Sequence, residues 1–154
     1  MFKHIGIVVK KDQKDGDTSL PDSLLPILAK YTSEIFIEEG SDIKNSLLTE
    51  LKTDDFLKQI DLLIVFGGDG TLLGSARNIL EYETPILGIN LGAVGFLTDV
   101  NIDNFESIIQ DILQGNYDIE ERSLVSAKFL DQILFGLNEI VIHSGSYAQL
   151  MRYQ

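Results

Sequence analysis

The chain has 154 residues, 44% of them hydrophobic, which is enough to enclose the core of one compact domain. Its 24 acidic and 12 basic residues give a formal charge of -12, which excludes a broad electrostatic interface with nucleic acid or an anionic membrane. The lack of cysteine excludes disulfides, zinc–thiolate sites and a cysteine nucleophile. With no secretory signal pattern and no apolar run of membrane-spanning length, the sequence favours a soluble cytoplasmic protein.

Short apolar runs and helical patterns alternate along the first part of the chain. Residues 5–9 form a short apolar, β-branched run and residues 34–38 an alternating one, both typical of strands, and a helical pattern at 24–31 lies between them. Pro26 favours a helix start after Ser23, because proline suits a first turn better than a helix interior.

The alternation continues to about residue 115. A helical or broken helical face at 45–60 leads into a continuous apolar run at 62–66, which suits a strand covered on both faces of a parallel sheet. Three further elements are predicted: a helix over 71–80, a strand over 85–89, and a helix that begins after Asp103 or Asn104 and ends at Gly115.

After Gly115 the helical period fades and strands are predicted to follow one another, at 117–120, 124–130 and 133–142. We therefore predict an α/β fold over residues 1–120, with an open, mostly parallel sheet flanked by helices. The truncated start of a β-rich second domain follows at 121–154.

A glycine-rich turn, Gly67-Gly68-Asp69-Gly70, follows the buried run at 62–66. Such a turn accepts positive φ angles at several positions and lets a phosphate approach the bare backbone. If Thr71 opens the next helix, free N–H groups and the helix dipole face the same point. Asp69 indicates phosphoryl transfer, as a base for an attacking hydroxyl or a ligand of Mg²⁺. The plainer alternative is a tight turn in which Asp69 bonds its own backbone.

Residues 88–98 form a second glycine-spaced segment after a predicted strand, and we expect it to lie beside the first turn as another wall of one crevice. Phe96 either packs on a purine base or anchors this loop in the core, and its chemistry alone favours the anchor.

Asn138 and Glu139 interrupt the apolar run at 133–142, where a polar pair needs hydrogen-bond partners. Ribose hydroxyls would satisfy both side chains, and simple strand alternation, with one of them facing water, is an equal alternative. His143 is interpreted as a strand-end residue, and Arg77 and Arg122 as solvated surface charges.

In their order and spacing these segments resemble the NAD kinase family, and the resemblance extends over nearly the whole chain. The residues that carry it are Gly67-Gly68-Asp69-Gly70-Thr71, then Gly88-Ile89-Asn90 with Gly95-Phe96-Leu97-Thr98, then Asn138-Glu139. The first motif also occurs in lipid kinases and phosphofructokinases, whereas the other two are more specific to NAD kinases.

The resemblance implies an ATP-dependent phosphotransferase that phosphorylates the 2′-hydroxyl of the adenosine ribose of NAD to give NADP, with polyphosphate as the donor in some members. It implies Asp69 as the catalytic base and Mg²⁺ or another divalent metal as cofactor, for which no ligand residue is assigned. It also implies a homo-oligomer in full-length members. The residues implied for phosphate and ATP binding are Gly67, Gly68, Gly70 and Thr71, and those for NAD binding are Asp69, Gly70, Phe96, Asn138 and Glu139.

The chain departs from the family in length, because members continue into a complete β-rich domain whereas this sequence ends at Gln154. We expect a fragment whose strands after Glu121 have unpaired edges, so that it aggregates, self-associates or needs the missing half from another chain. Activity of the chain alone is not expected. The alternatives are a related lipid or sugar kinase and a catalytically silent nucleotide-binding or interaction module.

Overall fold

The computed structural model describes residues 2–10, 20–91, 95–98 and 100–142, and the chain divides into two compact units, Met1–Glu120 and Glu121–Gln154. Among the described residues of the first unit, six strands form one parallel sheet in the order β3-β2-β1-β4-β5-β6. The second unit contains an antiparallel pair, β7-β8. The predicted fold class, a parallel sheet flanked by helices and followed by β structure, is confirmed.

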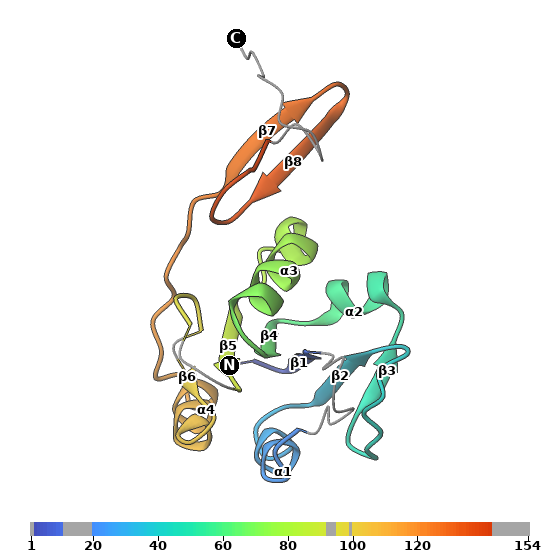
Figure 1. The fold of residues 1–154 in the computed structure, drawn as a ribbon. Coiled ribbons are helices and arrows are strands. Elements are labelled where there is room, and N and C mark those ends of the chain that lie inside the picture. Colours follow the sequence, from blue (N-terminus) through green and yellow to red (C-terminus); the bar gives the residue numbers. More distant parts are fainter. Residues whose placement is uncertain (1, 11–19, 92–94, 99, 143–154) are drawn as a thin grey trace. The chain divides into compact units, whose positions relative to one another are not determined.

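The elements follow one another along the chain as the labels in Figure 1 indicate. The strands are β1 (His4–Val9), β2 (Glu34–Glu38), β3 (Thr49–Leu51), β4 (Leu62–Phe66), β5 (Ile86–Asn90), β6 (Val100–Asn101), β7 (Val125–Phe129) and β8 (Gln132–Gly136). The helices are α1 (Leu24–Leu28), α2 (Thr53–Gln59), α3 (Asp69–Ile79), the 3₁₀ helix η1 (Leu80–Tyr82) and α4 (Phe105–Leu113).

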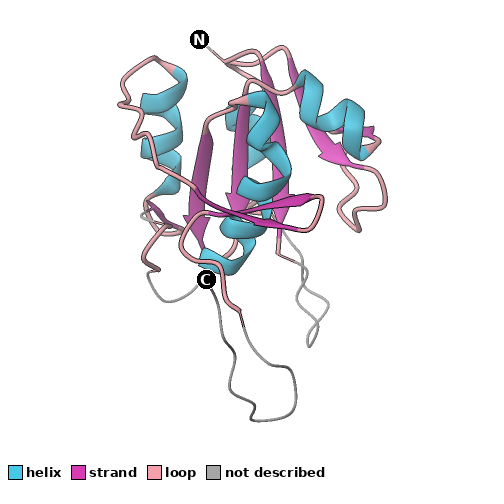
Figure 2. Cartoon of the chain, turned by 90° about the horizontal axis from the view of Figure 1, so that it is seen from above, coloured by secondary structure: helices cyan, strands magenta, loops and turns pink. Residues whose placement is uncertain are grey.

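The helices of the first unit cover both faces of the sheet. In Figure 1, α1 and α4 lie on one face and α2 and α3 on the other, and Figure 2 shows the helices packed along neighbouring strands. The connections β1–α1–β2 and β4–α3–β5 cross the sheet in opposite directions, so crossovers of the same right hand put α1 and α3 on opposite faces. The strand order reverses between β1 and β4, which is where open α/β sheets bind ligands, beyond the carboxyl ends of the strands.

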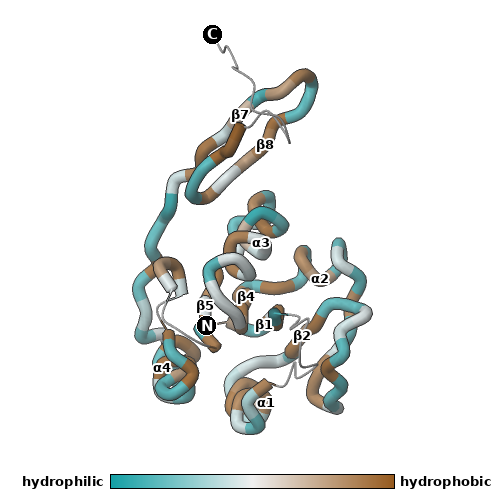
Figure 3. Tube along the Cα trace, in the orientation of Figure 1, coloured by the Kyte–Doolittle hydropathy of each residue, from teal (hydrophilic) through white to brown (hydrophobic). Residues whose placement is uncertain are grey.

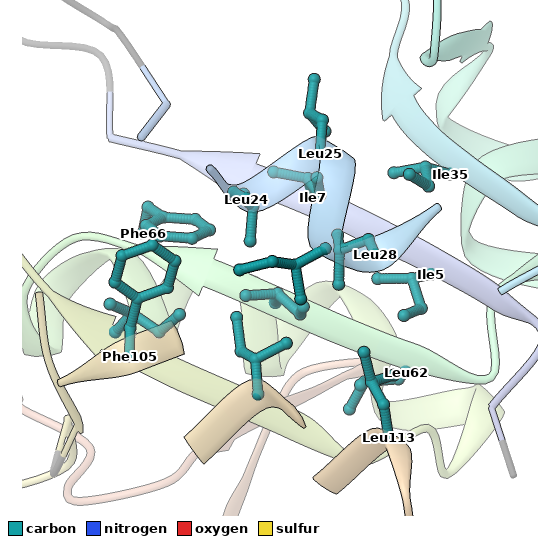
Figure 4. Close-up of a cluster of buried hydrophobic side chains, with 14 of the residues drawn as sticks. Ile5, Ile7, Leu24, Leu25, Leu28, Ile35, Leu62, Phe66, Phe105 and Leu113 are labelled. Carbon is teal, nitrogen blue, oxygen red and sulfur yellow. The ribbon is translucent and has the colours of Figure 1, made fainter. Parts of the chain in front are cut away.

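The main hydrophobic core lies between the sheet and the α1/α4 layer (Figure 4). Alternate residues of the central strands point to this face, as the pleat of a strand requires. Its fully buried members include Ile5, Ile7, Leu24, Leu28, Ile64, Phe66 and Ile89, and Phe105 packs edge-on against Phe66 with ring centroids 6.4 Å apart.

The opposite face of the sheet uses two strand glycines to admit its helices. A Cβ at Gly6 would lie 2.8 Å from the Phe56 ring, and a Cβ at Gly88 would lie 2.5 Å from Leu72 Cδ1. Both distances are well inside van der Waals contact, so α2 and α3 approach β1 and β5 only because these positions lack side chains. Gly88 thereby sets the distance between α3 and β5, the two elements on which the site below is built.

Two predicted boundaries in the first unit are wrong. The helical interpretation of residues 45–60 misses β3, which pairs in parallel with the edge of β2 before α2 begins at Thr53. Backbone pairing at an open sheet edge outweighs local helical spacing over three residues. The helix expected over 71–80 begins two residues earlier, at Asp69, with Gly68 extended at its N-cap. By contrast, α1 begins at Leu24, after Ser23, as Pro26 predicts.

Two predicted strands also need correction. Residues 117–120 form no strand, and the Tyr117 ring instead stacks on Phe2 with centroids 5.2 Å apart. The run 133–142 is not one strand, because β8 ends at Gly136. The chain bends there so closely that a Cβ at Gly136 would lie 2.5 Å from the Glu139 carbonyl oxygen.

None of the helices in the described part of the chain is both long enough and apolar enough to cross a membrane.

Candidate active site

Asp69 is the first residue of α3 and follows the carboxyl end of β4 by two glycines. Its position therefore lies at the edge of the sheet where the strand order reverses. An acidic residue in the first turn is favoured by the positive end of the helix dipole. The side chain is directed across to the segment 95–98, which follows the neighbouring strand β5.

Both oxygens of the Asp69 carboxylate accept hydrogen bonds from that segment. The Phe96 N–H donates to Oδ2 at 2.7 Å, and the Leu97 N–H donates to Oδ1 at 3.0 Å. The Thr98 hydroxyl adds a longer contact to Oδ1 at 3.3 Å. Among the described residues, the alternative in which Asp69 bonds its own turn is wrong, because its partners lie 27 to 29 residues away along the chain.

Behind the carboxylate lies a buried polar pair. The Asn90 side chain donates from Nδ2 to Thr98 Oγ1 at 2.9 Å. Asn90 is the last residue of β5 and is 3% exposed, and Thr98 is fully buried. Their burial is tolerated because the polar atoms are hydrogen-bonded to one another and to Asp69.

Close approach between the two loops depends on glycine. A Cβ at Gly95 would overlap Asp69 Oδ1 and lie 2.7 Å from Thr98 Oγ1. A Cβ at Gly67 would lie 2.6 Å from Thr71 Oγ1. Among the described glycines, only Gly40 and Gly115 have positive φ, so the 67–70 turn does not use the positive φ angles that its glycines would accept. Glycine is needed at position 67 because a side chain there would collide with the following helix.

The hydrogen bonds lower the pKa of the Asp69 carboxyl below its ordinary value. The largest cause is the Phe96 N–H, followed by the Leu97 N–H, with the Thr98 hydroxyl and backbone contributing further and desolvation opposing them. Donors that point at a carboxylate stabilise its charged form. Asp69 is therefore an ionised acceptor at neutral pH.

The backbone N–H groups of the turn divide into two sets. The Gly67 N–H donates to the Ile89 carbonyl at 2.9 Å, and the Thr71 N–H donates to the Gly68 carbonyl at 3.0 Å. Among the described residues, the N–H groups of Gly68, Asp69 and Gly70 have no acceptor. A Cβ at Gly68 or Gly70 would meet nothing within 4 Å, so the backbone there is open to a ligand.

The Phe96 side chain is 89% exposed, so the interpretation of this ring as a core anchor is wrong. Its backbone, not its ring, holds the loop, through the N–H bond to Asp69. An exposed aromatic ring beside an ionised carboxylate is a surface on which a planar ligand can stack.

The other sequence candidates belong to other elements of the chain. Asn138 and Glu139 belong to the second unit, are exposed, and lie after β8 rather than within a strand. Arg77 is exposed in the last turn of α3, at the opposite end of that helix from Asp69, and Arg122 is exposed in the second unit. His143 lies outside the described residues.

Sequence reasoning missed the residues that hold Asp69. Asn90, Gly95 and Thr98 were recognised only as parts of a glycine-spaced segment, without roles of their own. The available signal was the combination of a polar residue at the end of a buried strand with a threonine eight residues later.

These features define the class of protein. A doubly wound parallel sheet with a glycine-rich turn and an ionised aspartate at its switch point is the architecture of α/β proteins that bind nucleotides and their phosphates. Among such proteins, the family described as "ATP-NAD kinase N-terminal domain" matches residues 5–117. The chain belongs to the NAD kinase family.

Individual relatives agree with this membership. An NAD kinase of Escherichia coli O1:K1 / APEC is 36% identical over 165 aligned positions, which cover 99% of this chain and 54% of the relative. An NAD kinase of Chromohalobacter salexigens is 32% identical, covering 99% and 54%. The crystal structure of yeast NADH kinase complexed with NADH superposes with a TM-score of 0.65 at 18% identity, covering 87% of this chain and 46% of that one, and so supports the fold. The chain spans about half the length of the curated relatives it matches.

Proposed function

We propose that this chain forms the catalytic wall of an NAD kinase, which transfers a phosphoryl group from ATP to the 2′-hydroxyl of the adenosine ribose of NAD. The observation that carries the proposal is the Asp69 carboxylate, which is ionised and held by the N–H groups of Phe96 and Leu97 beside unpaired backbone donors. Family membership supports these substrates, and the chemistry of the site fits them.

Asp69 is the proposed base. The ribose hydroxyl oxygen forms a bond to the γ-phosphorus, the bond from that phosphorus to the leaving ADP oxygen breaks, and the hydroxyl proton passes to the carboxylate. A carboxylate of lowered pKa is a weak base, so the proton moves late, after the new P–O bond has largely formed. The main contribution of Asp69 is then to orient the hydroxyl.

The phosphates are proposed to bind at the start of α3, on the N–H groups of Gly68 and Gly70. Thr71 would contribute its hydroxyl, since its own N–H already donates to the Gly68 carbonyl. Gly67 is proposed to contribute indirectly, because the absence of a side chain there allows the turn to pack closely against Thr71.

The NAD contacts are proposed at Asp69, Gly70 and Phe96, whose exposed ring would stack on the adenine. Asn138 and Glu139 would satisfy ribose hydroxyls with their exposed amide and carboxylate. These two residues belong to the second unit, so their role is proposed independently of that of Asp69.

A divalent metal such as Mg²⁺ is proposed to accompany the phosphoryl donor. Within the described part of the chain, no three acidic, histidine or cysteine side chains gather into a metal site. Mg²⁺ is commonly held by substrate phosphates with few protein ligands, so no residue of this chain is assigned to it. When bound, the metal would neutralise developing charge on the phosphates.

The proposal has three further parts. Polyphosphate is an alternative phosphoryl donor, the full-length protein is a homo-oligomer, and its location is cytoplasmic.

The test is NADP formation from NAD, ATP and Mg²⁺ by purified chain 1–154, alone and mixed with a family member's C-terminal half, and by its Asp69→Asn and Asp54→Asn variants under the same two conditions. Asp54 is a matched control, because it is also an aspartate in the first turn of a helix, in α2. The proposal predicts turnover in the mixture, which Asp69→Asn lowers by a factor of roughly 10² to 10⁴ and which Asp54→Asn leaves unchanged.

The other possible outcomes distinguish the alternative functions. Turnover that survives Asp69→Asn rules out Asp69 as the base. Nucleotide binding without turnover identifies a binding module, and turnover that appears only when a family member's C-terminal half is added identifies an incomplete kinase. Turnover with diacylglycerol or fructose 6-phosphate in place of NAD would favour a lipid or sugar kinase.

A further inference from the structure

The hydrogen bonds of the Asp69 carboxylate are distributed unequally between its two oxygens. Oδ1 accepts from the Leu97 N–H and the Thr98 hydroxyl, whereas the hydrogen bond to Oδ2 comes from the Phe96 N–H. A carboxylate oxygen has two lone pairs in the carboxylate plane. Among the described residues, Oδ1 thus accepts two hydrogen bonds and Oδ2 accepts one, so Oδ2 has the greater capacity for a further donor.

The direction of the Thr98 hydroxyl follows from its other partner. Because Asn90 Nδ2 donates to Thr98 Oγ1, the hydroxyl oxygen serves as the acceptor in that bond and its proton is left to point elsewhere. The acceptor in reach is Asp69 Oδ1, at 3.3 Å. The order of donation is thus Asn90 to Thr98 to Asp69.

We propose that Thr98, oriented by Asn90, is a positioning residue for Asp69: its hydroxyl occupies Oδ1 and leaves Oδ2 as the oxygen that receives the ribose proton. This inference rests on the proposed function, in which Asp69 is the base. Neither Thr98 nor Asn90 touches a reacting atom, and both act through the carboxylate.

The surroundings of the pair suit this task. Asn90 ends a strand that is hydrogen-bonded to both neighbouring strands. The sheet therefore fixes the position of Asn90, the first donor in the chain of hydrogen bonds that leads to Asp69. Thr98 is fully buried, and its methyl carbon lies close to Gly88, where an added Cβ would be 2.9 Å away. Packing of the methyl group therefore fixes the direction of the hydroxyl.

The experiment compares chain 1–154 with Thr98→Val, which removes the hydroxyl and keeps the shape, and with Thr98→Ser, which keeps the hydroxyl. The Asp69 carboxyl carbon is titrated by NMR, and exchange of the Leu97 N–H is measured with it. In Thr98→Val we expect the pKa of Asp69 to rise toward its ordinary value and Leu97 N–H exchange to accelerate roughly tenfold. Thr98→Ser should retain most of the original behaviour.

Ser75→Ala is the matched control, because Ser75 also has a buried hydroxyl, which donates to the Thr71 carbonyl within α3 at 3.0 Å. It should leave the Asp69 titration unchanged. If Thr98→Val fails to fold, an NMR titration of the unsubstituted protein still tests the inference. In that protein the chemical shifts of the Thr98 methyl group and of the Phe96 and Leu97 amides should change with the same pH midpoint as the Asp69 carboxyl.

The inference is overturned if Thr98→Val leaves the Asp69 titration and Leu97 exchange as they were, if Thr98→Ser disrupts them as much as Thr98→Val, or if the Thr98 methyl does not follow the Asp69 midpoint. Turnover is a separate readout, in which Thr98→Val should lower kcat roughly tenfold with little change in KM for NAD. Positive NMR results in a chain that shows no turnover even with a family member's C-terminal half would contradict the proposed function and leave the positioning of Asp69 by Thr98 supported.

Discussion

At the scale of single residues, Asp69 links two segments that are distant in sequence. The carboxylate joins the start of α3 to the loop after β5 through two backbone N–H groups and one hydroxyl. The same bonds that favour its ionised form hold the loop in place. A residue that looks purely catalytic in the sequence therefore also has a structural role.

The structural role of Asp69 predicts a pH dependence of stability. Its folded pKa lies below the ordinary value of 3.8, so its ionised form contributes stability that is present above that pH and lost as the pH falls through the folded pKa. Asp69→Asn should therefore be less stable than the unsubstituted chain at neutral pH, and the difference should shrink on acidification. Denaturant unfolding of both proteins between pH 7 and pH 2 measures this difference in stability. A difference that does not vary with pH would contradict the prediction.

Gly95 is predicted to be intolerant of any side chain. The methyl group of Gly95→Ala would overlap Asp69 Oδ1 and push the loop from the carboxylate, at a cost of about 1–3 kcal/mol in unfolding free energy. Gly74→Ala is the control, because a Cβ there meets nothing within 4 Å and alanine favours a helix interior, so it should be neutral or stabilising by about 0.5–1 kcal/mol. Chemical denaturation gives the unfolding free energy of each variant, and equal changes in the two variants would refute the steric argument.

At the scale of elements, the distances between helices and sheet are set by small residues in strands. Gly6 admits Phe56 and Ile60 against β1, and Gly88 admits Leu72 of α3 against β5. The second contact determines how far the N-terminus of α3 lies from the loop that contains Thr98. Packing on this face of the sheet thus controls the geometry of the site.

Gly6→Ala tests this packing without touching the site. Its Cβ would lie 2.8 Å from the Phe56 ring and 2.9 Å from two Ile60 carbons, so we expect a loss of about 1–3 kcal/mol of unfolding free energy. Adding Phe56→Leu should recover part of the loss, because the smaller side chain makes room for the methyl group. Thermal unfolding of the single and double variants measures the coupling, and strictly additive effects would argue against direct contact.

At the scale of the whole molecule, the two units differ in how completely they bury apolar side chains. The first has a closed core, whereas both strands of the β7-β8 hairpin carry exposed apolar residues, seen as brown segments in Figure 3. Within the hairpin the most exposed large side chains are Phe129, Leu130 and Ile133. Exposed apolar surface of this kind favours association.

Self-association through the hairpin is therefore expected. Sedimentation velocity of chain 1–154 should show species that grow with concentration, and Phe129→Lys combined with Ile133→Lys should shift them toward monomer. Leu47→Lys is the control, because Leu47 is an exposed leucine in the first unit and its replacement should change nothing. A monomer at all concentrations, or equal effects of both replacements, would contradict this expectation.

The sequence by itself determined the fold class, the central strands and the position of Asp69 between glycines. Residues 34–38 and 62–66 were assigned with the boundaries that β2 and β4 have, because the alternation at 34–38 and the continuous apolar run at 62–66 leave few alternatives. It did not determine β3, the start of α3 or the end of β8.

Only the tertiary structure decided what Asp69 contacts and how it is held. The bonds to Phe96, Leu97 and Thr98 join residues about thirty positions apart, and they exist because β4 and β5 are neighbours in the parallel sheet. Local patterns report burial and period, whereas the partner of a polar side chain depends on which strands pair. The exposed ring of Phe96 and the polar pair Asn90 and Thr98 followed from that pairing and not from spacing along the chain.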